Sequence, residues 1–448
     1  MKEPIQNQEN DAMNDELKRK KRKKIKRVIL TSVLVLTIFF GGMTTGWFLL
    51  EPEFRSLIKM KIAIDNFYYT DVDDDTFFNT IFNAINQEVL DDYSWYMSAE
   101  EYQEYTSAGE GNQSGIGIVF LIQDVASSSL YVSRVCGNSP AERAGIEAGD
   151  YVLGIGRTAS GLNAFENFES FLAYLNEFET SEPFYLQVQK GGGEDAEIQV
   201  VSLSKENYME SYVFYRTATT AYGFEGEKGL HMVEKGKPLS SLDDKTAYIR
   251  LTSFNGAVVE EFAQAMNQFR VDGMQNLVLD LRGNGGGYVH MMQSIASYFC
   301  KNTQEAKPVV AVADYGTRKH VFKANGNYYN EYFTQESRIC VLADANSASA
   351  SECLIGSMLD YGTISYSDIC LSERNGQIKT YGKGIMQTTY TLGFGGDAIK
   401  LTTALIRWPL SNNCIHGRGV LPEDGALYVT ETGDFEEETA LSLAKLFS

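Results

Sequence analysis

An apolar run leads into a glycine-rich turn in the second half of the chain: Leu277-Val278-Leu279-Asp280-Leu281-Arg282-Gly283-Asn284-Gly285-Gly286-Gly287. The run has the composition of a buried strand. Residues 246–254 are predicted to form an earlier strand, and residues 258–269 are predicted to form an amphipathic helix between these two strands. Strand, helix, strand, turn and helix in this order predict an α/β core, with a mixed or parallel sheet and flanking helices.

The glycine-rich turn has three candidate uses. It lacks the Gly-Lys-Ser/Thr of a P-loop and the spacing of a dinucleotide fingerprint, which argues against a phosphate site. A plain turn is the simplest interpretation. The third use is to expose a backbone N–H to an oxyanion, and the motifs described next favour it.

A serine and a lysine follow in small-residue surroundings. Ser349 lies within Asn346-Ser347-Ala348-Ser349-Ala350-Ser351-Glu352, and Lys383 lies within Tyr381-Gly382-Lys383-Gly384. A serine nucleophile needs a base, and a lysine can serve as one when burial holds it neutral. Alanines allow a tight strand-to-helix junction at Ser349, and glycines allow close backbone approach at Lys383. Each segment alone is more often a helix cap or an exposed turn, so the interpretation depends on the other motifs.

The histidines and cysteines add no competing site. None of the four histidines lies in a nucleophile-elbow pattern, so a Ser-His-Asp triad is disfavoured. The six cysteines are scattered, without metal-ligand spacing. We expect mostly buried thiols, with one bridge left open, and no metal or cofactor.

The first fifty residues have the pattern of a membrane anchor. Nine of the ten residues from Lys18 to Arg27 are Lys or Arg, and residues 28–50 are uncharged. This predicts a cytoplasmic basic segment at 1–27 and a transmembrane helix at 28–50, with the remaining chain on the outer face of the plasma membrane. A cleaved signal peptide is the alternative, but the region around Gly41-Gly42-Met43 lacks an Ala-x-Ala-like cleavage site.

The rest of the chain is acidic. After residue 50 there are 29 basic and 54 acidic side chains, a net charge of −25. This charge argues against a nucleic-acid partner. The length of this part is enough for two or three domains.

A helical region is predicted at 51–109. Apolar residues recur at helical spacing in it, and Ser98 with Glu101 forms a capping box at the start of its last helix. A Gly/Ser/Asn break at 108–114 separates this region from a β-rich module.

The module at 110–204 resembles a PDZ domain. Its most recognisable stretch is Ser139-Pro140-Ala141-Glu142-Arg143-Ala144-Gly145-Ile146, followed by Gly149-Asp150 before an apolar strand. The resemblance implies a mainly-β inserted domain that binds peptide C-termini. Its carboxylate-binding loop would be Gly115, Ile116, Gly117 and Ile118, and a simple tight turn is the alternative.

The motifs together resemble a known enzyme family. In order, they are Asp91-Asp92-Tyr93-Ser94, the PDZ-like segment, 279–284, 349–352, 382–387, 401–404 and 415–423. This series is similar to that of the carboxy-terminal processing peptidases, a bacterial Ser-Lys family with an inserted PDZ domain. The similarity runs from about residue 55 to the end and implies a peptidase core at 205–448.

The resemblance also implies residue roles. Ser349 would be the nucleophile, Lys383 the base and Gln387 the residue that orients it. The oxyanion would rest on the backbone N–H groups of Ala350 and Gly286. A shift of one residue along 285–287 is left open.

The implied function is that of a membrane-anchored extracytoplasmic serine endopeptidase. It would cleave near the unstructured C-termini of secreted or membrane proteins, with recognition and gating by the PDZ-like domain. The sequence leaves open an activating partner or a homo-oligomer. The main alternative is a membrane-tethered peptide-binding adaptor with an inert core, and a carbohydrate- or lipid-acting hydrolase would have no obvious use for the PDZ-like module.

Two features depart from the family pattern. Ser349 and Lys383 are 34 positions apart, which is about nine more than is usual in the family and predicts a surface insertion within 364–380. The sequence Arg407-Trp408-Pro409-Leu410 also differs from the usual sequence of the family at this place. This difference bears on substrate specificity rather than on the chemistry.

Overall fold

The computed structural model describes residues 26, 30–32, 37, 50–121, 128–192, 196–226, 230–393, 395–430 and 435–447. The chain divides into two compact units, residues 1–85 and 86–448. The first unit contains helix α2 (Pro52–Phe67) and most of α3 (Asp74–Glu88). Helices therefore begin at Pro52, as the helical character predicted for residues 51–109 requires.

The predicted membrane span is not tested here. Residues 28–50 fall almost entirely outside the described residues. Among the residues that are described, no helix combines the length and apolar character needed to cross a bilayer. The anchor and the cytoplasmic segment at 1–27 stay predictions.

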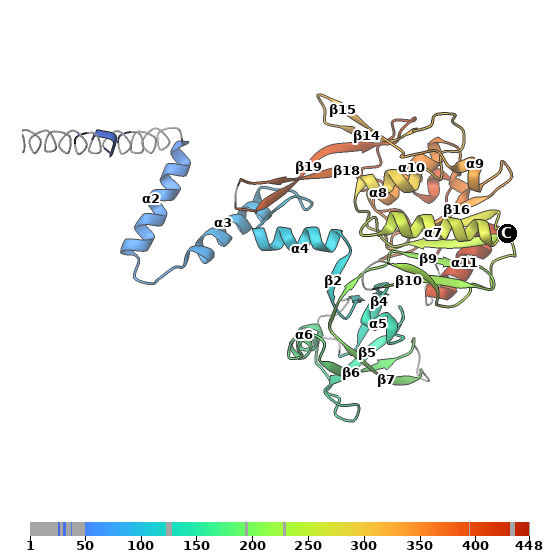
Figure 1. The fold of residues 1–448 in the computed structure, drawn as a ribbon, viewed down its shortest axis with the longest axis horizontal. Helices are drawn as coiled ribbons and strands as arrows, with labels where there is room; N and C mark the ends of the chain where they lie inside the picture. Colours follow the sequence, from blue (N-terminus) through green and yellow to red (C-terminus); the bar gives the residue numbers. More distant parts are fainter. Residues whose placement is uncertain are drawn as a thin grey trace, which may run out of the picture. The chain divides into compact units, whose positions relative to one another are not determined.

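The core of the second unit is an eight-stranded mixed sheet (Figure 1). Its order is β11-β10-β9-β12-β13-β16-β17-β20, and the five strands from β12 to β20 run parallel. The predicted α/β core is thus confirmed. The strands are β9 (Val213–Arg216), β10 (Ala221–Glu225), β11 (His231–Glu234), β12 (Thr246–Leu251), β13 (Asn276–Asp280), β16 (Ile339–Asp344), β17 (Ile369–Ser372) and β20 (Leu427–Val429).

Helices cover both faces of this sheet. On β12, Ala247 and Ile249 pack with one set of helices, whereas Tyr248 faces the opposite cluster with the C-terminal helix. Successive residues of a strand point to opposite faces, so a strand buried on both faces is apolar throughout. The helices on the first face are α7 (Val258–Val271), α8 (Val289–Ala296), α9 (Tyr329–Tyr332) and α10 (Ala350–Asp360), and the helix on the second face is α11 (Phe435–Phe447).

A second, antiparallel sheet lies in the same unit. Its order is β1-β19-β14-β15, with β18 also paired to β19. The strands β18 and β19 are long and form a hairpin that is bulged near Gln387. The bounds are β1 (Trp95–Met97), β14 (Val309–Asp314), β15 (Lys319–Lys323), β18 (Ile385–Thr391) and β19 (Ala398–Arg407).

A buried ionic network joins α11 to the parallel sheet. The Arg282 guanidinium is only 1% exposed, and it donates to Asp280 and, at 2.8 Å, to Glu438 of α11. Arg374 also donates to Glu438, at 2.7 Å. Buried charges are tolerated only when they are paired, so these side chains hold the helix against the strand ends.

The PDZ-like module has its own sheet and core. The sheet order is β3-β4-β5-β6-β7, with β3 at one edge, and residues such as Val132, Phe171 and Phe184 form a separate apolar cluster. The β-rich character is confirmed, and the PDZ assignment stays a prediction. The bounds are β3 (Ile118–Leu121), β4 (Leu130–Val135), α5 (Pro140–Arg143), β5 (Tyr151–Gly156), α6 (Phe168–Asn176), β6 (Pro183–Gln189) and β7 (Ile198–Ser204).

The predicted break at 108–114 is partly wrong. Helix α4 (Ala99–Gly109) begins with the expected Ser98–Glu101 capping box, but Asn112–Gly115 then forms strand β2, paired with β8 (Glu206–Met209). This ribbon leads into and out of the PDZ-like module. The residues of β2 are polar and either exposed or half-buried, so no apolar alternation marks this strand in the sequence.

The segment predicted as a surface insertion is partly internal. A short 3-10 helix, η1 (Tyr366–Asp368), leads into strand β17, whose residues are all buried between β16 and β20. Ser365, Ser367 and the turn at 373–378 lie at or near the surface. Another 3-10 helix, η2 (Pro422–Asp424), precedes β20.

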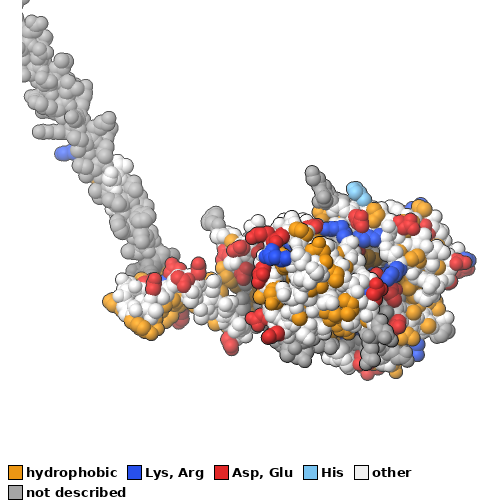
Figure 2. Space-filling view, turned by 90° about the horizontal axis from the view of Figure 1, so that it is seen from below, with side chains coloured by type: hydrophobic (Ala, Val, Ile, Leu, Met, Phe, Trp, Pro, Cys, Tyr) orange, Lys and Arg blue, Asp and Glu red, His pale blue; other side chains and the backbone are white. Residues whose placement is uncertain are grey.

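Charge and thiols agree with the sequence analysis. On the face of the molecule shown in Figure 2, acidic side chains lie in several separate groups, in keeping with the overall charge of −20. All six cysteines are free, and four of them are buried. The expectation of mostly buried thiols is confirmed.

Replacing Arg282 should destabilise the protein strongly. Arg282→Met removes the cation that pairs with the buried Asp280 carboxylate and one of the two arginines that donate to Glu438, so the free energy of unfolding should fall by about 3–5 kcal/mol in urea unfolding. Lys237→Met is the control, because Lys237 forms an exposed ion pair with Glu147 and is 71% exposed. The control should change stability by less than about 1 kcal/mol, and equal losses in the two variants would contradict a structural role for the network.

Candidate active site

Ser349 lies at a strained junction between β16 and α10. Its backbone angles are φ 56° and ψ −111°, in a region that non-glycine residues rarely adopt, at a cost of about 1–3 kcal/mol. The junction is held by Asn284, whose carbonyl accepts from Ala348 N and from Ser351 Oγ, each at 2.9 Å. The tight strand-to-helix turn predicted at Ser349 is confirmed, and the glycine-rich turn after β13 is what supports it.

The carboxylate of Glu352 joins the Ser349 turn to the Lys383 loop. It accepts hydrogen bonds from the backbone N–H of Ser349 at 3.0 Å, of Gly382 at 2.7 Å and of Lys383 at 2.8 Å. The Thr380 hydroxyl donates a fourth, at 2.6 Å. Burial raises the pKa of Glu352, and the four hydrogen bonds oppose that shift. This one side chain therefore sets the spacing of the two backbones.

The glycines beside Lys383 allow close contact with residues 415–420. A Cβ on Gly384 would lie 2.6 Å from His416 N, and one on Gly382 would lie 2.9 Å from Gly419 N. Gly417 N donates to Gly382 O at 2.9 Å. Close backbone approach at Lys383 is therefore confirmed, and the 415–420 segment provides the surface that it approaches.

The Lys383 side chain lies over an aromatic ring. Its Nζ is 4.7 Å from the centroid of the Tyr93 ring, and Tyr93 Oη is 2.9 Å from Tyr381 Oη. The pKa of Lys383 is lowered, first by burial and then by the charge of Lys400, while the carboxylates of Asp91 and Glu352 oppose the shift. In the described structure no hydrogen bond joins Lys383 Nζ to Ser349 Oγ.

Gln387 lies on β18, four residues after Lys383. Its Nε2 donates to Thr402 Oγ1 at 3.4 Å, and Thr402 N donates to Ser94 Oγ at 2.8 Å. The Asp91–Ser94 motif therefore has a structural use, because it braces the hairpin that carries Gln387.

One cavity of about 970 Å³ brings the three predicted catalytic residues together. Ser349, Lys383 and Gln387 all line it. Lys400 of β19 lines it as well, and so does His320. The parallel sheet contributes the serine through α10, and the antiparallel sheet contributes both lysines and the glutamine.

The two predicted oxyanion donors differ. Ala350 N–H is in the first turn of α10, where backbone N–H groups have no intrahelical acceptor. Gly286 N–H already donates to Asn284 Oδ1 at 2.9 Å, so the expected free donor at Gly286 is not found. The cause is the Asn284 side chain, which folds back over its own turn. Gly286 still packs against the serine, since a Cβ on it would lie 2.9 Å from Ser349 Cβ.

The sequence motifs assign no role to Glu352 or Lys400. Ser349 and Glu352 have capping-box spacing, which was a usable signal for Glu352. Lys400 had no such signal, because its contacts are the rings of Trp95 and Tyr105, far away in the chain.

The predicted peptide-binding loop lies outside this cavity lining. Gly115 pairs with Glu206 at the end of the β2–β8 ribbon, and Ile118 opens β3. Between them, Ile116 O accepts from Ala141 N and Gly117 O accepts from Cys136 N, each at 2.9 Å. The loop carbonyls thus bond inward, to the module itself.

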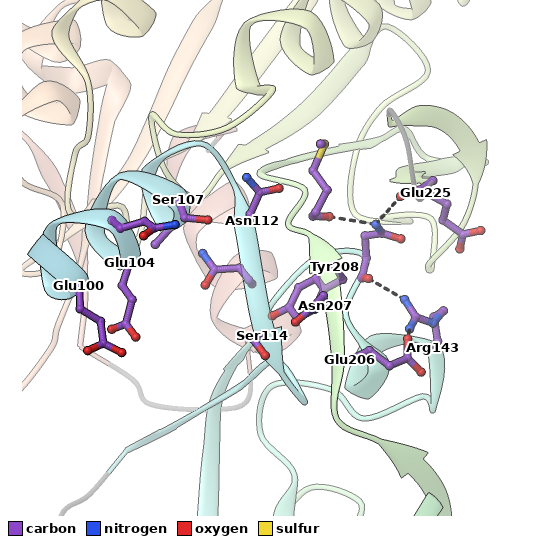
Figure 3. A pocket seen from close by; sticks show the side chains of 16 residues that line it. Glu100, Glu104, Ser107, Asn112, Ser114, Arg143, Glu206, Asn207, Tyr208 and Glu225 are labelled. Atoms are coloured by element: carbon purple, nitrogen blue, oxygen red, sulfur yellow. Dashed lines mark hydrogen bonds and ion pairs between the residues drawn. The ribbon is translucent and has the colours of Figure 1, made fainter. Parts of the chain in front are cut away.

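A second, larger cavity of about 1240 Å³ shares Ala108 and Gln113 with the first. Figure 3 shows its polar lining, with Glu100 and Glu104 on α4 and with Arg143 beside Glu206. It contains neither Ser349 nor Lys383.

Comparison with known proteins agrees with this geometry. Residues 245–424 match the model of peptidase family S41. The carboxy-terminal processing protease CtpB of Bacillus subtilis is 24% identical over 366 residues, which are 81% of this chain and 66% of that protein. A protein described as a CtpA-like serine protease of Staphylococcus saprophyticus is 23% identical over 374 residues, 83% of this chain and 65% of that protein.

The chain therefore spans slightly under two thirds of the length of these two relatives. Among solved structures, a photosystem II D1 C-terminal processing protease has a TM-score of 0.44 and 19% identity, over 83% of this chain and 86% of that one. Residues 245–424 are thus similar to peptidase family S41, and most of the chain is similar to proteins described as carboxy-terminal processing or CtpA-like serine proteases.

Replacing Glu352 should loosen both backbones at once. Glu352→Gln puts an NH₂ group where an oxygen accepts, so the amides of Ser349, Gly382 and Lys383 should exchange with solvent about 10- to 100-fold faster. Hydrogen exchange followed by mass spectrometry measures this without any substrate. Glu336→Gln, at an exposed site, is the control, and unchanged exchange in Glu352→Gln would rule out the bridging role.

Proposed function

We propose that this chain is a serine endopeptidase with carboxy-terminal processing activity, in which Ser349 and Lys383 form the catalytic dyad. The observation that carries the proposal is that Ser349, Lys383 and Gln387 line one cavity, while Glu352 bonds to the backbone of both dyad residues.

The chemistry is acyl transfer. Ser349 Oγ attacks the carbonyl carbon of the scissile peptide while its proton passes to the neutral Lys383 amine. Lys383 then protonates the leaving amine, and the acyl-enzyme remains. A water molecule, deprotonated by Lys383, attacks the ester. Lys383 returns this proton to the leaving Ser349 Oγ, and the new C-terminus is released. Ala350 N–H donates to the oxyanion of each tetrahedral intermediate.

Catalysis requires one rearrangement of the described structure. Lys383 Nζ must leave the ring of Tyr93 and reach Ser349 Oγ, which a rotation of its flexible side chain can accomplish. Gln387, which lines the same cavity four residues after the moving lysine, supplies an amide oxygen that can accept from its amine. The described arrangement then corresponds to a resting enzyme, in keeping with gating.

The PDZ-like module supports recognition of C-terminal tails. Among the described strands, β3 lies at the edge of its sheet, and the ring of Phe120 packs 5.9 Å from that of Phe168 on α6. An extended peptide can add to β3, with its carboxylate at the N–H groups of the Gly115–Ile118 loop.

The same module reaches the catalytic cavity. Arg134 of β4 lines the cavity and donates to Glu210 at 2.7 Å, next to the β2–β8 ribbon. A tail bound at β3 can therefore act on the cavity wall through β4 and the ribbon, which is the physical basis for gating.

The location of the protein is part of the proposal. The basic residues at 18–27 and the uncharged residues at 28–50 support a single-pass plasma-membrane anchor with an extracytoplasmic peptidase. Release of the full chain from membranes by alkaline carbonate would contradict it.

The dyad is tested by single substitutions. Ser349→Ala and Lys383→Ala should each lower kcat/KM on casein by about 10³-fold or more, because the nucleophile or its base is lost. Ser367→Ala and Lys237→Ala, at exposed positions, are matched controls. If the parent retains peptides without shortening them, the adaptor with an inert core is the better description.

Tail recognition is tested with paired peptides. A substrate with a free C-terminal carboxylate should be cleaved about tenfold faster than the same peptide with an amidated end, because charge-assisted hydrogen bonds to the loop are lost. Gly117→Ala should remove this preference, since its Cβ would lie 2.2 Å from Ser139 Cβ. Gly192→Ala, in open space, should keep it. If the parent cleaves the free and the amidated peptide at equal rates, the proposed recognition of the C-terminal carboxylate is contradicted.

A further inference from the structure

A second lysine lies in the wall of the catalytic cavity. Lys400 is on β19, opposite Trp95 of β1 in the strand register. Its Nζ is 4.2 Å from the centroid of the Trp95 ring and 5.0 Å from that of Tyr105 on α4. Among the residues that the structure describes, no carboxylate lies within ion-pair distance of Lys400 or Lys383. The charge of Lys400 is thus stabilised by two aromatic faces but is not neutralised.

We propose that Lys400 is a positioning residue of the dyad: held as the cation between Trp95 and Tyr105, it repels a proton from Lys383 and so keeps the base neutral. The proposal rests on the proposed peptidase function of the same site.

Two ammonium groups that share one desolvated cavity cannot both be charged at low cost. The ring contacts decide which of them carries the charge. Lys400 faces two rings, one of them the indole, which is the most favourable cation–π partner. Among the described residues, Lys383 faces one ring, that of Tyr93. The proton is therefore held preferentially by Lys400.

Other charged and titratable groups near Lys383 and Lys400 also influence which of the two lysines carries a proton. Asp91 and Glu352 favour the charged form of Lys383, so removing Lys400 leaves their effect unopposed. Burial lowers the pKa of Lys400 as well, which its two ring contacts counteract. Arg134 and Glu210, in the same cavity wall, pair with each other. Tyr93 and Tyr381 are bonded together beside Lys383.

The test is the pH dependence of kcat/KM for the full chain in mild detergent. A lysine base must be neutral, so activity rises with pH through the pKa of Lys383. Lys400→Met keeps the length of the side chain and removes the charge, and it should move this rise to higher pH by about 1 unit. Near neutral pH, kcat/KM should then fall about tenfold, while the high-pH limit is retained. Lys400→Arg should restore the parent profile.

Two controls separate this effect from a packing defect. Lys319→Met removes an exposed lysine from the same sheet and should leave the profile in place. Trp95→Leu removes the better ring and should shift the profile in the same direction as Lys400→Met. An unshifted profile in Lys400→Met overturns the proposal, and so does equal loss of activity at every pH, which would make Lys400 itself a base or a structural residue.

A second readout does not need peptidase activity. In the Ser349→Ala background, the amine of Lys383 reacts with an acylating reagent only when it is neutral, and mass spectrometry measures its modification against pH. Lys400→Met should raise the midpoint of this reaction by the same amount as the activity profile. A shift in labelling without proteolysis in the parent would support Lys400 and reject the proposed function. Proteolysis without a shift would do the reverse.

Discussion

The arrangement of the site depends on one buried carboxylate. Glu352 is 1% exposed and accepts hydrogen bonds from the Ser349 turn and from the loop that carries Lys383. These two segments belong to different sheets, and nothing in the local preferences of either would place them together. Burying a carboxylate is costly unless it is hydrogen-bonded, so the loss of any of its four donors is unfavourable. Glu352 therefore holds the backbones of the Ser349 turn and the Lys383 loop at one distance.

The positive φ of Ser349 is held by a second set of contacts. The strain is sustained because Asn284, in the turn after β13, holds the residues on both sides of the serine. The ionic network around Arg282 holds the turn after β13 against α11. The cavity differs from this network, since its two lysines are desolvated, lie over aromatic rings and, among the described residues, have no carboxylate within ion-pair distance. The framework is thus held by paired charges, while the reacting groups are left unpaired.

Sequence analysis recovered most of the architecture for identifiable reasons. The strand at 276–280 and the helix at 258–271 were predictable because their apolar residues recur with the period of their element. The β2 ribbon was missed because its residues are polar, and β17 was read as an insertion because only its buried position shows it to be a strand. Within the site, Ser349, Lys383 and Gln387 were found by motif, whereas the Asn284 bond to Gly286 N–H could not be, since a side chain that folds back over its own turn leaves no pattern.

The sequence by itself determined the residue types and their order: a serine at a helix start, a lysine between glycines, an apolar strand before a glycine-rich turn, and a basic segment before an uncharged one. These are local properties, and local physics is sufficient to read them. Only the tertiary structure decided which groups meet: Glu352 with the Lys383 loop, Lys383 with Tyr93, and Lys400 with Trp95 and Tyr105. Such contacts join residues far apart in the chain, and their energies arise from burial and charge that exist only once the two sheets have packed.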